Sequence, residues 1–435
     1  MGVKGVFPAI PVGRAKEAVR VGPREVPIVW RGDVLVVGGD LSGVAASVEA
    51  AKHGAKVALI CEDGFLGGIV TSGLLCRLGR MAREASVGGF VEDLIYRLDR
   101  LGGRRGDIAD PEALKIALDD MLLSVGVKPF YHTRPVGALS ERGWARGAIA
   151  VTKRGYIALY ARRVVDATPD GRIEASLRGR PLRSGRRRIL VCSGGILEGA
   201  KVKSSEFVKC PEPLDLLGRG VWLHPGPSEE EAILVVRRVV ELDPFDPFAL
   251  SVEASRGRWA VRRALELLKK SRPDLSKAYL SLTSLRPWLV DPALPSNRPR
   301  RRPLRPWEAL RGWIPEGSVS LVLADIYKAD LAGNRLELLA QGRPFGLPYG
   351  WLLPRGIEGL VCAQPIWVLS STPLVWVEDP LASATAGQVA GLAASLSVQM
   401  GLLPSKLPLS SLKEHLEGLP QSAGAQISIS RSLTM

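Results

Sequence analysis

The segment that begins at Asp33–Gly39 constrains the fold more than any other part of the chain. Its run Val34-Leu35-Val36-Val37 is continuously apolar and ends in glycines, as a strand does when it is buried on both faces of a parallel sheet. A helix is expected at Leu41–His53, where small apolar side chains recur and Gly54 follows as a stop. Lys56–Cys61 then has the composition of a second strand. Together these elements form a βαβ unit, so we expect an α/β fold with a parallel sheet.

Composition narrows the class of protein further. The chain has 435 residues, 46% of them hydrophobic and 24% charged, which predicts two or three packed units and excludes a disordered or collagen-like chain. The 59 basic and 44 acidic residues leave a formal net charge of +15. This charge suits a polyanionic partner and equally suits a soluble enzyme with an arginine-rich surface, so it does not decide between them.

Cysteine usage and the N-terminal segment predict a cytoplasmic protein. The five cysteines lie far apart and form no C-x-x-C unit, so we expect neither a zinc nor an iron–sulfur site and no bound metal. An odd count of thiols without a signal peptide favours a reducing compartment. No membrane span is expected, because the most apolar stretch, around Leu360–Val377, is interrupted by Gln364 and by prolines.

Further patterns divide the chain into five segments. Asp110-Pro111-Glu112 starts a helix that runs to Gly126, and short strands of a β-meander follow it. From about residue 190 the sequence becomes rich in tryptophan and contains mixed helix signals, such as the capping box Ser228-x-x-Glu231. An Ala- and Gly-rich helix is expected at Asp379–Gln399. The predicted segments are an N-terminal arm (1–30), a first part of the sheet domain (31–190), an inserted α+β domain (191–330), a second part of the sheet domain (331–405) and a C-terminal helix and tail (406–435).

Two glycine-rich loops and one acidic residue form the candidate site. The loop from Gly38 to Gly43 lies between strand and helix, where backbone N–H groups and the helix dipole can hold a pyrophosphate. Glu62, twenty-four positions after Gly38, ends the second strand and can accept hydrogen bonds from ribose hydroxyls. The run Gly64-Phe65-Leu66-Gly67-Gly68-Ile69-Val70-Thr71-Ser72-Gly73 follows at once. Singly, each feature is explained by chain turns and caps; in this order and spacing they favour a nucleotide site.

These motifs resemble those of the FAD-dependent oxidoreductases related to the flavin subunit of heterodisulfide reductase, a branch of the glutathione-reductase-type flavoproteins. The resemblance rests on the strand, glycine loop, terminal Glu62 and the G-F-L-G-G-x-x-T-x-G run. It continues through Asp166-Ala167-Thr168 and through Ala386-Gly387-Gln388-Val389-Ala390-Gly391. It covers about residues 31–172 and 342–420 and implies a discontinuous Rossmann-like FAD-binding domain with a β-meander, interrupted by an inserted substrate domain.

The resemblance implies roles for individual positions. The FAD pyrophosphate would contact Gly38, Gly39 and Gly43, and the adenosine half would contact Glu62, Val136 through its backbone, and Ala167. The flavin side would be approached by Gly67, Gly68 and Thr71 and by the helix start before Gln388. The implied function is hydride or electron transfer through non-covalently bound FAD, with a small-molecule substrate or a redox partner protein. Catalytic side chains, the substrate and the assembly, a homo-oligomer included, are not specified.

Four positions depart from the family's pattern. Asp40 occupies the second glycine of G-x-G-x-x-G, where a carboxylate crowds and repels a pyrophosphate. Pro169 and Gln364 replace residues of two further motifs, and Asp379 places an acid before the late helix. Two alternatives therefore stay open. One is a cofactor-degenerate homologue acting as a structural or electron-transfer subunit, and the other is a polyanion-binding protein that uses the basic segment Arg298–Arg305, although nucleic acid is not the expected partner.

Overall fold

The expected strand, helix and strand are present in the computed structural model. They are β2 (Ile28–Val37), α1 (Leu41–Lys52) and β3 (Val57–Ile60), and β2 and β3 pair in parallel. The structure describes residues 3–7, 25–83, 88–179, 185–210, 215–291, 293, 305–333, 335–341, 343–364, 367–371 and 373–417. Of the basic segment Arg298–Arg305, all but the last residue lies outside the described residues.

An eight-stranded sheet organises the first unit, which confirms the predicted α/β class with a parallel sheet and a meander. Its order is β1-β7-β8-β9-β2-β3-β6, and β20 pairs with β9. The strands not yet given are β1 (Lys4–Val6), β6 (Lys128–Phe130), β7 (Arg134–Glu141), β8 (Trp144–Thr152), β9 (Gly155–Asp166) and β20 (Leu360–Cys362). Strands β9, β2, β3, β6 and β20 run parallel, whereas β7, β8 and β9 form the antiparallel meander. Not all strands of the meander are short, because β9 is one continuous strand of 12 residues, and the N-terminal segment adds β1 to the meander.

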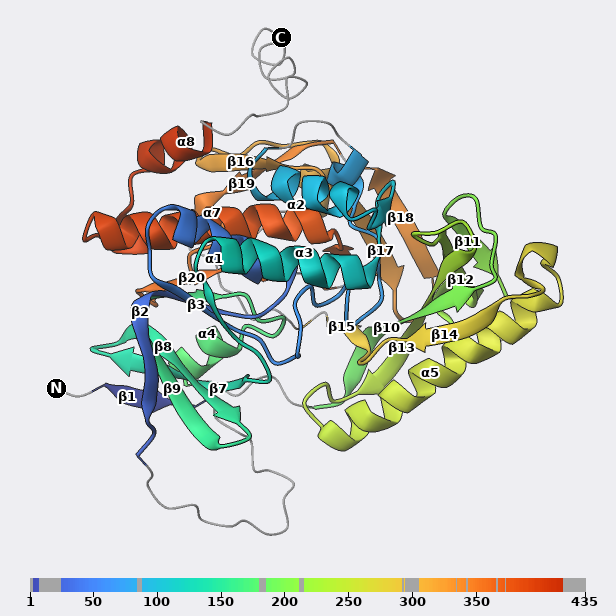
Figure 1. The fold of residues 1–435 in the computed structure, drawn as a ribbon, viewed down its shortest axis with the longest axis horizontal. Coiled ribbons are helices and arrows are strands. Elements are labelled where there is room, and N and C mark those ends of the chain that lie inside the picture. The colour runs from blue at the N-terminus through green and yellow to red at the C-terminus, as the bar shows by residue number, and fades with distance from the viewer. Residues whose placement is uncertain are drawn as a thin grey trace, which may run out of the picture.

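Helices α1, α2 (Gly89–Arg100), α3 (Pro111–Ser124) and α7 (Pro380–Gln399) cover one face of this sheet (Figure 1). The late helix α7 lies directly on α1 although some 340 residues separate them in sequence. A Cβ atom on Gly387 would stand 2.0 Å from the carbonyl oxygen of Ser42, and one on Gly391 would stand 2.1 Å from that of Ala46. Only glycine allows two helix backbones to approach this closely. Among the described residues, α7 alone has the length and apolar composition of a membrane span, and it is wholly buried inside the fold.

A second sheet forms the inserted unit. Its order is β11-β12-β13-β10-β14, and β15 pairs with β10. The strands are β10 (Arg187–Glu198), β11 (Glu206–Lys209), β12 (Gly220–Pro225), β13 (Glu231–Leu242), β14 (Tyr279–Thr283) and β15 (Trp288–Val290). The long helix α5 (Pro247–Lys269) covers the sheet face that points away from the first unit (Figure 1). The capping-box pattern at Ser228 does not start a helix: the amide N–H of Ser228 bonds the Glu231 carboxylate in a turn, and β13 begins there.

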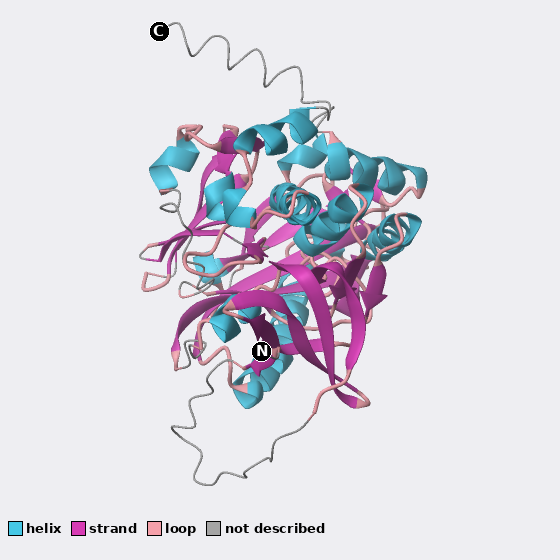
Figure 2. Ribbon diagram, turned by 90° about the vertical axis from the view of Figure 1, so that its left-hand side faces the viewer, coloured by secondary structure: helices cyan, strands magenta, loops and turns pink. Residues whose placement is uncertain are grey.

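The remaining elements complete the molecule around α7. Strand β17 (Asp325–Asp330) pairs with β18 (Arg335–Gln341) and β22 (Leu374–Val377). The predicted boundary at residue 330 therefore falls between β17 and the two strands with which it pairs. The others are β4 (Arg104–Arg105), β5 (Ile108–Ala109), α4 (Arg172–Leu177), α6 (Pro306–Leu310), β16 (Ser318–Val322), β19 (Phe345–Pro348), β21 (Trp367–Ser371) and α8 (Leu409–Glu417), with single-turn helices at Arg80–Arg83, Leu217–Arg219, Pro273–Leu275, Tyr349–Trp351 and Pro404–Lys406. Figure 2 shows the large curved sheet with most of the helices above it.

The two units touch where the second glycine-rich loop ends. A Cβ on Gly194 of β10 would stand 2.4 Å from the carbonyl oxygen of Leu74, so the inserted sheet packs directly on this loop. Beyond β14, the amide N–H of Leu285 donates to the carbonyl oxygen of Ser72 at 2.9 Å. The inserted unit is thereby fixed against the loop that the sequence predicts to face a flavin.

Candidate functional site

The first glycine-rich loop lies at the carboxyl ends of β2 and β9. The chain continues from β2 to β3 on one side and returns to β9 on the other, and ligands of open α/β sheets bind at such a switch point. Gly38 has φ 125°, and a Cβ there would stand 2.4 Å from the carbonyl oxygen of Ala167. A Cβ on Gly43 would stand 1.9 Å from the carbonyl oxygen of Gly38, and one on Gly39 would stand 2.3 Å from the Cys61 thiol. The three glycines therefore let strand, loop and helix close tightly, with Ala167 against them.

The N-terminus of α1 provides donors for an anion. Asp40 is the N-cap residue, but its side chain makes no capping hydrogen bond to the first turn. The hydroxyl oxygen of Ser42 is buried and has no hydrogen-bond partner among the described residues. The positive end of the helix dipole and the unsatisfied N–H groups of a first turn together favour a phosphate.

The carboxylate of Asp40 lies between the two glycine-rich loops. Its Oδ1 accepts a hydrogen bond from the amide of Ile69 at 3.1 Å, and a Cβ on Gly68 would overlap this oxygen, at 1.1 Å. The residue is only 4% exposed. Burial raises the pKa of Asp40 to about 6, although the charge of Arg286 acts in the opposite direction. An acid therefore occupies the space beside the α1 N-terminus that a glycine would leave open.

The second loop is closed largely on itself. The hydroxyl of Thr71 donates to the carbonyl oxygen of Leu66 at 2.7 Å, and a Cβ on Gly67 would stand 2.6 Å from the Thr71 methyl group. Gly67 has φ 103° and Gly68 has φ 47°, so both adopt conformations that favour glycine. The structure brings this loop against the first one, where the amide of Gly67 donates to the carbonyl oxygen of Gly39 at 2.9 Å.

The predicted adenosine contacts lie together at the ends of β3 and β7. Glu62 is exposed after β3, and the guanidinium of Arg134 lies 3.5 Å from its carboxylate. The pairing register of β7 with β8 shifts between Pro135 and Gly137, which leaves Val136 without a partner residue on β8. A bulge of this kind frees backbone groups, as a backbone contact to a base requires.

Gln388 is not brought to the loops. It lies in the third turn of α7, where its amide donates to the Glu49 carboxylate at 3.2 Å and packs against Gly89. The start of α7 is instead capped by Asp379, whose carboxylate accepts from the amides of Ala382 (3.0 Å) and Arg80 (3.2 Å). Burial raises the pKa of Asp379 to about 7.

The other two departures fit their local structure. Pro169 stands in a turn that leads from β9 to α4 and ends at Gly171, whose φ is 62°; the position after the first residue of such a turn suits proline. The preceding Asp166 is fully buried and accepts from the amide and hydroxyl of Thr168. Gln364 is buried just beyond β20.

The structure adds Arg286, which sequence reasoning missed. It lies between β14 and β15 of the inserted unit, and its Nη2 stands 3.0 Å from the Asp63 carboxylate. Its Nε is buried without a hydrogen-bond partner among the described residues. The sequence carried no signal for this contact, because a single arginine in a short loop is placed only by the packing of one unit on the other.

A buried polar cluster lies near the start of α7, between the two sheets. The guanidinium of Arg77 donates to Asp107 and to Asp325, each at 2.7 Å. Arg237 of β13 forms an ion pair with Glu378 at 2.5 Å, and its guanidinium lies over the ring of Tyr327. Buried nitrogen atoms without a partner among the described residues belong to Trp222, His224, Arg237 and Trp288.

His224 is neutral in this cluster. Burial lowers its pKa to about 3, and the charges of Arg77 and Arg237 act in the same direction. The pKa of Tyr327 is raised to about 12, chiefly by burial. Among the described residues no group of three His, Cys, Asp or Glu side chains has the geometry of a metal site.

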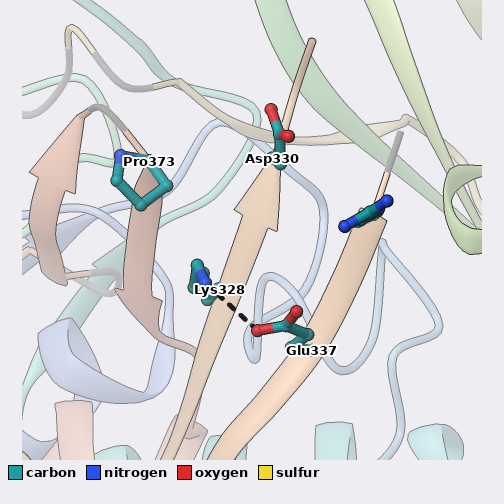
Figure 3. A pocket seen from close by; sticks show the side chains of 5 residues that line it. Lys328, Asp330, Glu337 and Pro373 are labelled. Carbon is teal, nitrogen blue, oxygen red and sulfur yellow. Dashed lines mark hydrogen bonds and ion pairs between the residues drawn. The ribbon is translucent and has the colours of Figure 1, made fainter. Parts of the chain in front are cut away.

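A surface pocket elsewhere has a different character. It lies on β17 and β18, where Lys328 and Glu337 form an ion pair at 3.2 Å (Figure 3). Its lining residues are Lys328, Asp330, Arg335, Glu337 and Pro373. These side chains carry charges of both signs. None of them belongs to the glycine-rich loops, so the pocket is separate from the candidate site.

Comparison with known proteins identifies the first unit. Residues 33–191, somewhat more than a third of the chain, match the model of the family described as FAD dependent oxidoreductase. This segment is similar to the FAD-dependent oxidoreductases. The match includes both glycine-rich loops, α1 and the meander, and it assigns FAD as the cofactor and oxidoreduction as the reaction class. No curated protein sequence matches the chain.

Solved structures are similar to this chain over much of its length. A geranylgeranyl bacteriochlorophyll reductase-like protein from Thermoplasma acidophilum is 14% identical with a TM-score of 0.50, covering 90% of this chain and 84% of its own. A myxobacterial chondrochloren halogenase is 13% identical with a TM-score of 0.45, covering 89% and 78%. A flavoprotein/dehydrogenase from Cytophaga hutchinsonii is 12% identical with a TM-score of 0.43, covering 86% and 79%. The first of these shows the overall fold.

Proposed function

We propose that the N-terminus of α1 holds the FAD pyrophosphate and that the chain transfers hydride or electrons through this non-covalently bound flavin. The observation that carries the proposal is the uncapped first turn of α1 at the switch point of the parallel sheet, with the buried Ser42 hydroxyl beside it. Unsatisfied donors at a helix N-terminus fit a pyrophosphate. The carboxylate of Asp40 is the one group of this set that opposes it.

The adenosine half would lie along β3 and β7. Glu62 is exposed, and its partner Arg134 stands 3.5 Å away on the surface, so ribose hydroxyls can replace this weak contact. Val136 would present its backbone to the adenine from the register shift of β7. Gly38, Gly39 and Gly43 would line the pyrophosphate side, and Ala167, which packs against Gly38 and Gly43, would lie toward the adenosine half.

The flavin side would face the second loop, Gly67, Gly68 and Thr71, and the inserted sheet that packs on it. Bound FAD supplies the hydride or electron acceptor. The chain supplies orientation and excludes water through the packing of Gly194 on Leu74. The thiols are poor candidates for the chemistry, because burial raises the pKa of Cys61 and of Cys192 to about 12.

The substrate would meet the flavin near the start of α7. Arg237 and Trp288 lie in one row across β13, β10 and β15, and His224 is on the neighbouring strand. Their buried nitrogens need partners, since an unsatisfied buried donor costs about 1–3 kcal/mol. This surface suits a substrate that carries hydrogen-bond acceptors, either a small molecule or a group presented by a redox partner protein.

The proposal also includes a closer family relation and a cytoplasmic location. The G-F-L-G-G-x-x-T-x-G run supports a relation to the flavin subunit of heterodisulfide reductase and to glutathione-reductase-type flavoproteins. The described cysteines are all free, which supports a reducing, cytoplasmic setting. A second candidate is a cofactor-degenerate homologue that serves as a structural or electron-transfer subunit, and the buried carboxylate of Asp40 in the pyrophosphate position favours it.

The visible absorption spectrum of the purified protein separates these candidates. We expect the absorption bands of oxidised flavin, either on purification or after incubation with FAD, and release of FAD on denaturation. Glu62→Gln should weaken FAD binding by about 1–3 kcal/mol, because it removes a charge-assisted acceptor. A protein that stays colourless after incubation with excess FAD would refute the first candidate and support the subunit.

A further inference from the structure

The second glycine-rich loop and the inserted unit bring one cation to three acids. The negative charge of Asp63 acts on the carboxyl group of Asp40, and Glu62 lies next to Asp63 in the chain. Arg286 reaches this group from the inserted unit and pairs with Asp63 at 3.0 Å. The pKa of Arg286 is raised: burial works against its charge, and the charges of Asp63, Asp40 and Glu62 outweigh that effect.

Arg286 is held close to the loop and still has a free donor. Its neighbour Leu285 donates a backbone hydrogen bond to Ser72, which fixes the base of the side chain. The Nε atom is buried and has no partner among the described residues, whereas 39% of the side-chain surface is exposed. The guanidinium is therefore anchored at one end, has an unused N–H donor at Nε, and lies close enough to Asp40 for the two charges to interact.

We propose that Arg286 binds the FAD pyrophosphate and offsets the carboxylate of Asp40, so that the cofactor site is completed only when the inserted unit is docked. The inference rests on the proposed FAD site. A guanidinium presents a planar fork of donors that matches phosphate oxygens, and it would add a positive charge where Asp40 adds a negative one. A site that has lost a loop glycine thereby regains a favourable charge balance from the other unit.

The test measures binding of FAD and of ADP to the full chain freed of flavin, at two salt concentrations. ADP carries the pyrophosphate without the flavin. Arg286→Gln should weaken both ligands by roughly 10- to 100-fold, and Arg286→Lys should recover part of the loss. The loss should shrink at high salt, because the contact is partly exposed. Arg262→Gln, on the exposed face of α5 in the same unit, is the matched control and should leave both affinities unchanged.

Asp63→Asn distinguishes a ligand contact from a structural ion pair. If Arg286 serves only to dock the inserted unit through Asp63, this variant should weaken FAD as much as Arg286→Gln does. Under our proposal it releases the guanidinium for the pyrophosphate, so FAD binding should be unchanged or tighter. In an Asp40→Asn background, Arg286→Gln should cost less than it does alone, because the carboxylate that it offsets is gone.

The outcomes separate this inference from the proposed function. If wild-type protein and Arg286→Gln bind FAD with equal affinity, the role of Arg286 is overturned and the proposed flavoprotein function stands. Equal losses in Asp63→Asn and Arg286→Gln would also overturn it in favour of docking. Wild-type protein that binds neither FAD nor ADP would refute both proposals.

Discussion

At the scale of single residues, Asp40 sets the properties of the site. Its carboxylate fills the gap between two glycine-rich loops and accepts the Ile69 amide, so it is tied into the local fold as well as being an obstacle to a phosphate. Because burial raises its pKa to about 6, the charge is present at neutral pH and is lost in mild acid. We therefore expect this residue to make both the stability of the fold and the proposed affinity for FAD depend on pH.

We expect wild-type FAD affinity to rise as the pH falls from 8 to about 5.5, because protonation removes the negative charge of Asp40 beside the pyrophosphate. Asp63, Glu62 and Arg286 face the same group, and the ring of His132 lies against Gly64. Asp40→Asn should flatten the part of the profile that belongs to Asp40. Asp40→Gly should bind FAD at least tenfold more tightly at pH 8, about 1.4 kcal/mol. Titrations at several pH values check this, and an unchanged slope in Asp40→Asn would assign the pH effect to another group.

Folding stability should respond with a defined sign. A carboxyl group whose pKa is higher in the folded than in the unfolded state stabilises the fold most when it is protonated. Its contribution to the free energy of unfolding is therefore lost as the pH rises from about 4 through about 6. The loss amounts to roughly 3 kcal/mol for Asp40. Asp40→Asn keeps an acceptor for the Ile69 amide and should be more stable than wild type at pH 8 but not at pH 4. Urea unfolding at both pH values measures the difference, and a gain of equal size at both would contradict the argument.

At the scale of elements, the sequence predicts best what local pattern controls. The β2–α1–β3 unit, α3 with its Asp110 cap, and α7 with its Asp379 cap were all predictable from apolar runs and capping residues. The Ser228 pattern failed because the same side-chain bond that caps a helix also closes a turn before a strand. Arg286 and the α1–α7 contact were not predictable, since both depend on packing between residues hundreds of positions apart.

At the α1–α7 contact, we expect a Gly→Ala substitution to destabilise the fold, although helix propensity alone predicts that it stabilises. In an open helix, Gly→Ala stabilises by about 1 kcal/mol. At Gly391 the new methyl group would meet the carbonyl oxygen of Ala46 at 2.1 Å, so the helices must separate. We expect Gly391→Ala to lower the free energy of unfolding by roughly 1–3 kcal/mol. Chemical denaturation measures it, and a stabilised variant would mean that the two backbones do not touch here.

At the scale of the whole molecule, the two units form a continuous structure. Leu285 bonds to Ser72, Gly194 packs on Leu74, and Arg77 bridges Asp107 of the first unit to Asp325 of β17. These contacts are backbone hydrogen bonds, close backbone packing or partly buried ion pairs, and separating the units would expose them all together. We therefore expect the proposed cofactor site to share its stability with the inserted sheet.

We expect a single thermal transition whose midpoint rises when FAD is added. At a free concentration of about 100 times Kd the ligand adds about 2.7 kcal/mol of stability. Differential scanning calorimetry and tryptophan fluorescence, which samples both units through residues such as Trp30 of β2 and Trp288 of β15, should give the same midpoint and the same shift. Two transitions, of which FAD moves only one, would show that the units unfold independently.

The position of α7 in the sequence also orders events during synthesis. The helix fits against Ser42 and Ala46 of α1, but it leaves the ribosome some 340 residues after them. At about 5–20 residues per second, that interval is roughly 17–70 s. Throughout it the face of α1 that packs on α7 lacks this partner. The packing of the β2–α1–β3 unit on its helical side can therefore be completed only after α7 has been translated.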